Sequence, residues 1–286
     1  MQTRRIGNLE VTAIGLGGMP MSIEGRPDEA RSIATIHAAL EVGVTLFDTA
    51  DSYHLHADDV GHNESLIARG IASWGGDTTH VLVATKGGHL RPGDGTWTVD
   101  GRPEHLKAAA EASLQRLGGD AIGLYQFHRP DPAVPYADSV GAIRDLLDAG
   151  TIRLAGISNA NPEQILLARE ILGGRLASVQ NQFSPAFRSS APELALCDRL
   201  GIAFLPWSPL GGIASAAALG NRFAAFGRVA VARGVSPQVV CLAWHLAQSP
   251  HVIPIPGASR PESIRSSVTA TELVLTTAEL AALDAA

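Results

Sequence analysis

The 286 residues include 22 Lys and Arg against 28 Asp and Glu, a formal net charge of −6. This acidic balance, without a run of basic residues, gives no support for a nucleic-acid-binding surface. A hydrophobic fraction of 45% and a charged fraction of 17% are typical of a globular protein with a sizeable core. Because the sequence has two cysteines and no apolar run of about 18 residues, we expect neither a disulfide framework nor a transmembrane helix. No signal peptide is recognisable, and a cytoplasmic location is expected.

From the N-terminus, two short runs around Gly7-Asn8 predict a β-hairpin over Thr3–Thr12. Short apolar strands then alternate with amphipathic helices. The predicted strands are Ala13–Gly17, Val44–Asp48, Val81–Lys86, Ile122–His128, Ile152–Ser158, Ser178–Gln182, Ile202–Trp207 and Val252–Pro256. The predicted helices are Asp28–Glu41, Asn63–Ser73, Pro103–Leu117, Ala137–Ala149, Pro162–Leu172, Ala191–Leu200, Ser236–Gln248 and Pro261–Thr269.

Eight strands separated by helices predict a (β/α)8 barrel, with the N-terminal hairpin capping it, as one domain over residues 1–286. A doubly wound open sheet is the alternative, but Gly15-Leu-Gly-Gly18 lacks the spacing and the following helix of a dinucleotide-binding turn. Gly87–Gly101 and Gly211–Asn221 are interpreted as loop insertions, and Thr276–Ala286 as a closing helix. Asn161 is a candidate N-cap before Pro162.

Ionisable or hydrogen-bonding residues stand at most of the predicted strand ends, where a barrel of this kind carries its active site. A tyrosine with a pKa near 10 is a poor acid at neutral pH, and a neighbouring lysine lowers that pKa. A carboxylate holds such a lysine charged, and a neutral histidine donates a hydrogen bond to a carbonyl oxygen. Asp48, Tyr53, Lys86 and His128 supply this set and point to proton transfer to an oxygen.

A metal hydrolase is a competing interpretation, because His54-Leu-His56 is followed by Asp58, Asp59 and His62. Zinc needs three or four converging ligands, and of the later strand ends only that at His128 adds a histidine. A polar loop at the mouth of the barrel is the simpler interpretation, and no metal is expected. Cys197 and Cys241 are expected to be buried packing residues.

The chain resembles the aldo-keto reductase superfamily, as a short-tailed, bacterial-type member. The motifs that carry the resemblance are Phe47-Asp-Thr-Ala-Asp-Ser-Tyr53, Ala84-Thr-Lys86, Tyr125-Gln-Phe-His128, Gly156-Ile-Ser-Asn159, Gln180-Asn-Gln-Phe183, Pro206-Trp-Ser-Pro-Leu-Gly211 and Ile255-Pro-Gly-Ala-Ser259. The resemblance implies a (β/α)8 barrel that binds NADPH, with NADH possible, and reduces aldehydes or ketones. It implies Tyr53 as the general acid, supported by Lys86 and Asp48, with His128 orienting the carbonyl.

The resemblance also implies the cofactor contacts. Ser158, Asn159 and Gln180 would hold the nicotinamide carboxamide, and Trp207 would stack on its ring. Ser208, Leu210 and Gly212 would follow the pyrophosphate, and Ser259, Arg260 and Ser263 would surround the 2′-phosphate. Many relatives carry Glu-Asn where this chain has Ser266-Ser267, so Ser267 marks a departure on the adenine side.

The resemblance does not identify the substrate. It implies a small carbonyl compound, for which pyridoxal is one candidate. The short tail would leave the pocket to be shaped by Met19–Ser22, His54–His62 and Gly87–Gly101 with Trp97. Some members bind NADPH as regulatory subunits of channels, and this is the second alternative. A monomer without nucleic-acid or membrane partners is expected.

Overall fold

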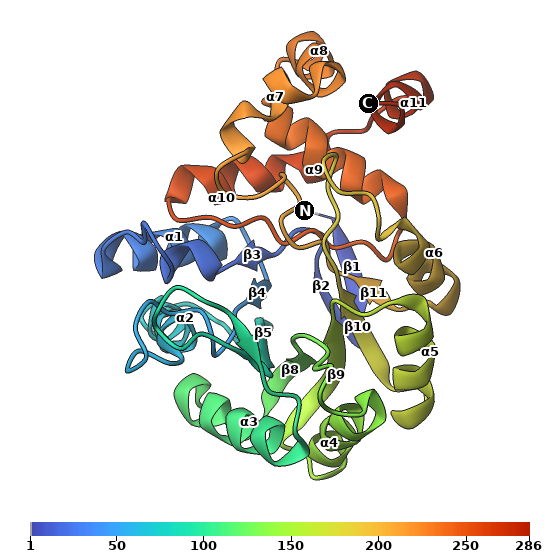
Figure 1. Cartoon of the computed structure of the whole chain (residues 1–286). Helices are drawn as coiled ribbons and strands as arrows, with labels where there is room; N and C mark the ends of the chain where they lie inside the picture. The colour runs from blue at the N-terminus through green and yellow to red at the C-terminus, as the bar shows by residue number, and fades with distance from the viewer. Residues whose placement is uncertain (1) are drawn as a thin grey trace.

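A ring of parallel strands forms the centre of the molecule in the computed structural model, which describes residues 2–286. Seven strands make one sheet in the order β11-β10-β9-β8-β5-β4-β3, and helices surround it (Figure 1). The strands are β3 (Leu16–Gly17), β4 (Leu46–Asp48), β5 (Leu82–Gly87), β8 (Ile122–Phe127), β9 (Ile152–Ser158), β10 (Leu176–Gln180) and β11 (Ala203–Phe204).

An eighth segment, Val252–Pro256, closes the ring between β11 and β3. Ile253 N donates to Phe204 O at 2.8 Å on one side, and on the other side Gly15 N and Gly17 N donate to Pro254 O and Pro256 O at 3.0 Å. The segment has strand position but is not a regular strand, because its two prolines have no N–H to donate to β3. The predicted (β/α)8 barrel is confirmed, with this one irregular strand.

The hairpin predicted at the N-terminus is confirmed as β1 (Thr3–Ile6) paired with β2 (Leu9–Thr12). Its buried side chains Ile6 and Val11 pack with the interior residues of the barrel, among them Leu46 and Leu205. Two larger clusters fill the layer between the strands and the surrounding helices. The hairpin therefore closes the end of the barrel at which the strands begin.

The helices that follow the strands begin at the signals expected from the sequence. Asp28 caps the first one, Asn161 forms a capping box with Gln164, and Pro103 and Pro162 occupy first turns. The helices of the outer layer are α1 (Glu29–Glu41), α2 (His62–Ala72), α3 (Pro103–Leu117), α4 (Tyr136–Asp148), α5 (Pro162–Ile171), α6 (Ala191–Leu200), α9 (Pro237–Gln248) and α10 (Pro261–Val268).

Two stretches interpreted as loops contain regular structure. The Gly87–Gly101 insertion forms an antiparallel hairpin of β6 (His89–Leu90) and β7 (Thr98–Val99). After β11 the chain forms short 3-10 and helical turns that include α7 (Leu219–Arg222) and then α8 (Ala224–Arg233), a helix that the sequence pattern did not reveal. The expected closing helix is α11 (Thr277–Asp284), capped by Thr276.

Within residues 2–286, no single helix meets the length and hydropathy requirements of a membrane span; only α8 and α9 taken together do, with a bend of 102° between them.

Candidate active site

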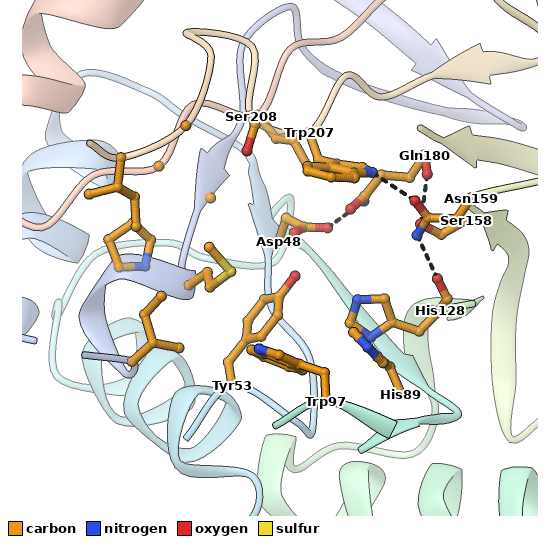
Figure 2. A pocket seen from close by; sticks show the side chains of 18 of the residues that line it. Asp48, Tyr53, His89, Trp97, His128, Ser158, Asn159, Gln180, Trp207 and Ser208 are labelled. Atoms are coloured by element: carbon orange, nitrogen blue, oxygen red, sulfur yellow. Dashed lines mark hydrogen bonds between the residues drawn. The ribbon is translucent and has the colours of Figure 1, made fainter. Parts of the chain in front are cut away.

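A cavity of about 740 Å³ opens at the end of the barrel where the strands finish. Figure 2 shows side chains from several strand ends pointing into it, with Tyr53 and His128 facing Trp207 across the space. The position follows from the fold, because parallel strands around a ring all end at the same edge.

A buried ion pair lies at the base of this cavity. Lys86, at the end of β5, donates from Nζ to Asp48 Oδ2 and to Thr49 O, both at 2.7 Å, and to the Tyr53 hydroxyl at 3.1 Å. Gln180 Nε2 donates to the other carboxylate oxygen of Asp48 at 2.8 Å. Lys86 is fully buried and Asp48 nearly so. Each charge thus has the partners that a buried charge requires.

The pKa of Tyr53 reflects several influences that act in opposite directions. Burial raises it, the positive charge of Lys86 lowers it, and the negative charge of Asp48 raises it, with a net shift upward from its ordinary value. Burial lowers the pKa of Lys86, but Asp48 and Tyr53 outweigh burial, and the net pKa is raised. Lys86 is therefore an ammonium and Tyr53 a protonated phenol at neutral pH, which is the state required for proton donation.

His128 follows β8 and lies next to Tyr53, with ring centroids 5.8 Å apart in an edge-on arrangement. Burial, followed by the charge of Lys86, holds the pKa of His128 well below its ordinary value. The imidazole is therefore neutral and keeps one N–H to donate, and its buried Nδ1 has no hydrogen-bond partner among the described residues. The four residues predicted as a catalytic set are brought together.

The predicted nicotinamide residues form a hydrogen-bonded group on the opposite side. Asn159 Nδ2 donates to His128 O at 3.0 Å, and Trp207 Nε1 donates to Asn159 Oδ1 at 3.2 Å. Ser158 Oγ donates to Gln180 O at 2.6 Å. Asn159 and Ser208 are the two non-glycine residues of the described chain with positive φ, at 56° and 49°. Backbone strain of this kind is concentrated at functional sites.

The remaining predicted cofactor residues divide into two groups. Ser208, Leu210 and Gly212 line the cavity. Ser259, Arg260, Ser263 and Ser267 lie outside its lining: Ser259 and Arg260 immediately precede α10, Ser263 is in its first turn and Ser267 is near its end.

Around α10, Arg260 is exposed and donates to Ser263 Oγ at 2.9 Å, with no carboxylate within 4 Å among residues 2–286. The side chain of Ser267 is used within the helix, where it donates to Ser263 O. Arg265 pairs with Glu41 at 2.5 Å.

The pocket walls differ in part from those expected. Met19, Pro20 and Trp97 line the cavity as expected, whereas none of the lining residues comes from His54–His62. His54 Nδ1 contacts His56 O at 2.7 Å, His62 Nδ1 contacts Ser22 Oγ at 2.8 Å, and Asp59 pairs with Arg26. No group of three or more potential metal ligands forms among the described residues.

Sequence reasoning did not single out three ionisable residues of the cavity, Glu24, His89 and Arg129. His89 and Arg129 follow strand ends, His89 shortly after Lys86 and Arg129 directly after His128, so the rule that led to the catalytic set would have found these two. His89 stacks on Trp97 with ring centroids 4.8 Å apart and also contacts His128. Burial, with the charges of Arg129 and Lys86, lowers the pKa of His89 to about 4, so this ring is also neutral.

The chain was compared with proteins of known sequence and structure. Residues 13–286 match the model of the aldo/keto reductase family. An uncharacterized oxidoreductase of Schizosaccharomyces pombe is 32% identical, over 99% of this chain and 89% of that protein. A 6-dehydroglucose reductase of Novosphingobium aromaticivorans is also 32% identical, over 91% of this chain and 87% of that protein.

Solved structures give the same result. A glycerol dehydrogenase of Gluconobacter oxydans aligns with a TM-score of 0.83 at 27% identity, covering 99% of this chain and 94% of that one. A thermostable aldo-keto reductase in complex with the inhibitor epalrestat also aligns with a TM-score of 0.83, at 26% identity, covering 100% and 99%. The fold, the cavity at the strand ends and these matches lead to one conclusion: the chain belongs to the aldo/keto reductase family and is an oxidoreductase.

Proposed function

We propose that this oxidoreductase reduces an aldehyde or ketone to an alcohol, with NADPH as the reductant and Tyr53 as the proton donor. The observation that carries the proposal is the contact of 3.1 Å between Lys86 Nζ and the Tyr53 hydroxyl, at the base of an open cavity. A phenol buried against an ammonium is a proton donor whose conjugate base is stabilised at the moment it forms.

The residues around the cavity fit a nicotinamide dinucleotide. Trp207 presents an aromatic side chain to the cavity. Gln180 gives its side-chain N–H to Asp48, while no described residue donates to its side-chain oxygen Oε1. A carboxamide is the kind of group that such an acceptor binds. Gly212 has a φ of 99° and open space where a side chain would begin, so a phosphate can approach the backbone there. When bound, the cofactor would supply the hydride.

Arg260 supports NADPH over NADH. Its guanidinium is exposed beside Ser263 at the first turn of α10, and it is not neutralised by a carboxylate within the described chain. A guanidinium and a helix N-terminus both favour a phosphate. Arg265, the other arginine of α10, is already paired with Glu41.

In the proposed reaction, His128 donates its N–H to the carbonyl oxygen and fixes its position. Tyr53 then gives its proton to the same oxygen as the carbonyl carbon is reduced, and Lys86 stabilises the phenolate that remains. Asp48 holds Lys86 charged and in place. The two cysteines are free and buried, which fits a reducing compartment such as the cytoplasm. The proposal also includes that the protein acts as a single-domain monomer.

The test is carbonyl-dependent oxidation of NADPH by the purified protein, over a panel of aldehydes, ketones, sugars and pyridoxal. Turnover of at least one carbonyl compound, with faster rates or tighter binding for NADPH than for NADH, is expected. Tight NADPH binding with no turnover across the panel would contradict the proposal and favour a role as an NADPH-binding regulatory subunit.

A further inference from the structure

The cavity has a second wall that the proposed chemistry does not use. It is formed by the β6–β7 hairpin and by the segment after β3. Residues of this wall are Met19, Pro20, Ile23 and Glu24 from one side, His89, Trp97, Thr98 and Val99 from the hairpin, and Arg129 after β8. Most of these side chains are apolar or aromatic, and Figure 2 shows Trp97 and His89 close to Tyr53 and His128. A substrate whose carbonyl lies against Tyr53 would therefore extend along this wall.

Arg129 is the one basic side chain among the described charged residues of this wall. It lines the cavity and is half-buried, and its Nε is buried with no hydrogen-bond partner in the described chain. No carboxylate lies within 4 Å of its guanidinium among residues 2–286. The nearby Asp131 is engaged elsewhere and accepts from Gly101 N and Ala133 N. Burying a cation without a partner is costly, so a partner is expected from outside the chain.

Arg91 shows what a satisfied arginine looks like in the same region. It is also buried, and it donates to His54 O and forms an ion pair with Glu24. Arg91 therefore neutralises Glu24, an acid of the cavity wall. Arg91 is therefore paired within the wall, whereas Arg129 has no carboxylate partner among the described residues.

The charges around the cavity do not balance. Among the described residues, three charged side chains line it, and two of them are paired: Asp48 with Lys86 at 2.7 Å and Glu24 with Arg91. His89 and His128 are neutral. Arg129 thus leaves one positive charge without a counterion, in a partly dehydrated space where a charge-assisted contact is strong.

We propose that Arg129 determines specificity by binding an anionic group of the substrate, so that the preferred substrate is an aldehyde or ketone that carries a carboxylate or a phosphate. This inference rests on the proposed carbonyl reduction. The anionic group would be held on the side of the cavity that His89 and His128 also line, because Arg129 directly follows His128.

The test compares charged substrates with uncharged counterparts that share the same aldehyde chain. Succinic semialdehyde is paired with its methyl ester for the carboxylate, and glycolaldehyde phosphate with glycolaldehyde for the phosphate. The variants are Arg129→Gln, which removes the charge, and Arg129→Lys, which keeps the charge but loses the planar fork. The matched control is Arg153→Gln, which removes an exposed arginine near the start of β9, outside the cavity.

For at least one pair, the wild type is expected to have a kcat/KM ratio of charged to uncharged substrate of about ten or more. Arg129→Gln lowers that ratio by roughly 10- to 150-fold, the loss that corresponds to one hydrogen bond to a charged group, mainly through KM. Arg129→Lys retains part of the preference and Arg153→Gln retains all of it. The pair with the larger ratio distinguishes a carboxylate from a phosphate. If Arg129→Gln does not fold, the Lys variant carries the same comparison.

A wild type that reduces uncharged aldehydes equally well would overturn this inference and leave the proposed function standing. An equal loss of kcat/KM for both members of a pair in Arg129→Gln would also overturn it, because that result shows a structural role. Weaker NADPH binding by Arg129→Gln would overturn it as well, because that result shows a contact with the cofactor. Calorimetric titration of the NADPH complex with succinate or inorganic phosphate needs no turnover. Arginine-dependent anion binding without reduction of any carbonyl would support an anion site at Arg129 and refute the proposed function.

Discussion

The two ends of the barrel each contain nearly inaccessible side chains, but of opposite chemical character. Where the strands begin, the hairpin covers the interior with Ile6 and Val11, which are almost inaccessible. Where the strands finish, the interior contains Lys86 and Asp48, which are equally inaccessible but charged. The apolar end gains free energy from burial itself, whereas the polar end requires each charge to be paired. One end therefore stabilises the barrel, and the other retains reactive groups in fixed positions.

Substitutions at the two ends test whether the apolar end provides stability and the polar end provides catalysis. The largest effect on catalysis is expected for Tyr53→Phe, because this change removes the proposed proton donor at the polar end. We expect the kcat for carbonyl reduction to fall by roughly 10²- to 10⁴-fold, with the Kd for NADPH unchanged by fluorescence titration. A variant that keeps more than half of the wild-type kcat would remove Tyr53 from the mechanism.

Lys86→Met tests whether the buried charge tunes the tyrosine. In the proposed mechanism, the oxidation of an alcohol uses Tyr53 as a base, which must be ionised. Burial already raises its pKa and Lys86 opposes this rise, so loss of Lys86 moves the required ionisation to higher pH. We expect the pH at which oxidation becomes half-maximal to move up by roughly one to three pH units. An unchanged pH–rate profile would show that Lys86 does not tune the tyrosine.

Asp48→Asn sharpens the same test, because Asp48 affects Tyr53 in two ways. It holds Lys86 in place, which lowers the pKa of Tyr53, and its own charge raises that pKa. In the wild-type background, we expect Asp48→Asn to raise the pH of half-maximal oxidation by less than Lys86→Met does. When Lys86 is already Met, we expect Asp48→Asn to lower that pH. Shifts that simply add in the double variant would show that Asp48 does not act through Lys86.

At the exposed rim of the polar end, Arg260→Ala has a moderate expected effect. Loss of one charge-assisted phosphate contact weakens NADPH binding by about 1.5–3 kcal/mol and leaves NADH binding nearly unchanged. Arg265→Ala is the control, since Arg265 lies on α10 but is already paired with Glu41 of α1. Equal weakening for both cofactors, measured by fluorescence titration, would show that Arg260 does not contact the 2′-phosphate.

Ile6→Ala, at the apolar end, has the smallest expected effect on catalysis and a large one on stability. Truncating this buried side chain lowers the free energy of unfolding by about 2–5 kcal/mol in urea, while kcat/KM stays near the wild-type value. Leu9→Ala in the same hairpin removes a partly exposed side chain and is expected to cost about 0.5 kcal/mol or less. A fall in kcat/KM for Ile6→Ala at a temperature where the variant is folded would contradict this division between stability and catalysis.

The sequence was most informative at the strand ends and least informative between them. Asp48, Lys86 and His128 were found because charged or polar residues stand out clearly at the ends of apolar strands. The β6–β7 hairpin was missed because its Gly- and Asp-rich turn obscures two very short strands. Helix α8 was missed because exposed Val231 interrupts its buried pattern. The pairing state of an arginine depends on neighbours that are distant in sequence, so the lack of a partner for Arg129 Nε became visible only in the structure.

The two prolines of the closing segment have a consequence for folding. Until the ring closes, Val252–Pro256 is the edge of an unfinished sheet, and edges of this kind pair with other chains. With Ile253 and Ile255 donating toward β11, the outward side of the segment offers carbonyl oxygens but, at Pro254 and Pro256, no N–H groups. The segment can thus complete its own barrel by accepting hydrogen bonds from the N–H groups of Gly15 and Gly17. It is a poor pairing partner for a strand of another chain, whose carbonyl oxygens would need N–H donors. The two prolines that make the eighth strand irregular thus also remove N–H donors from an edge that an open barrel would expose.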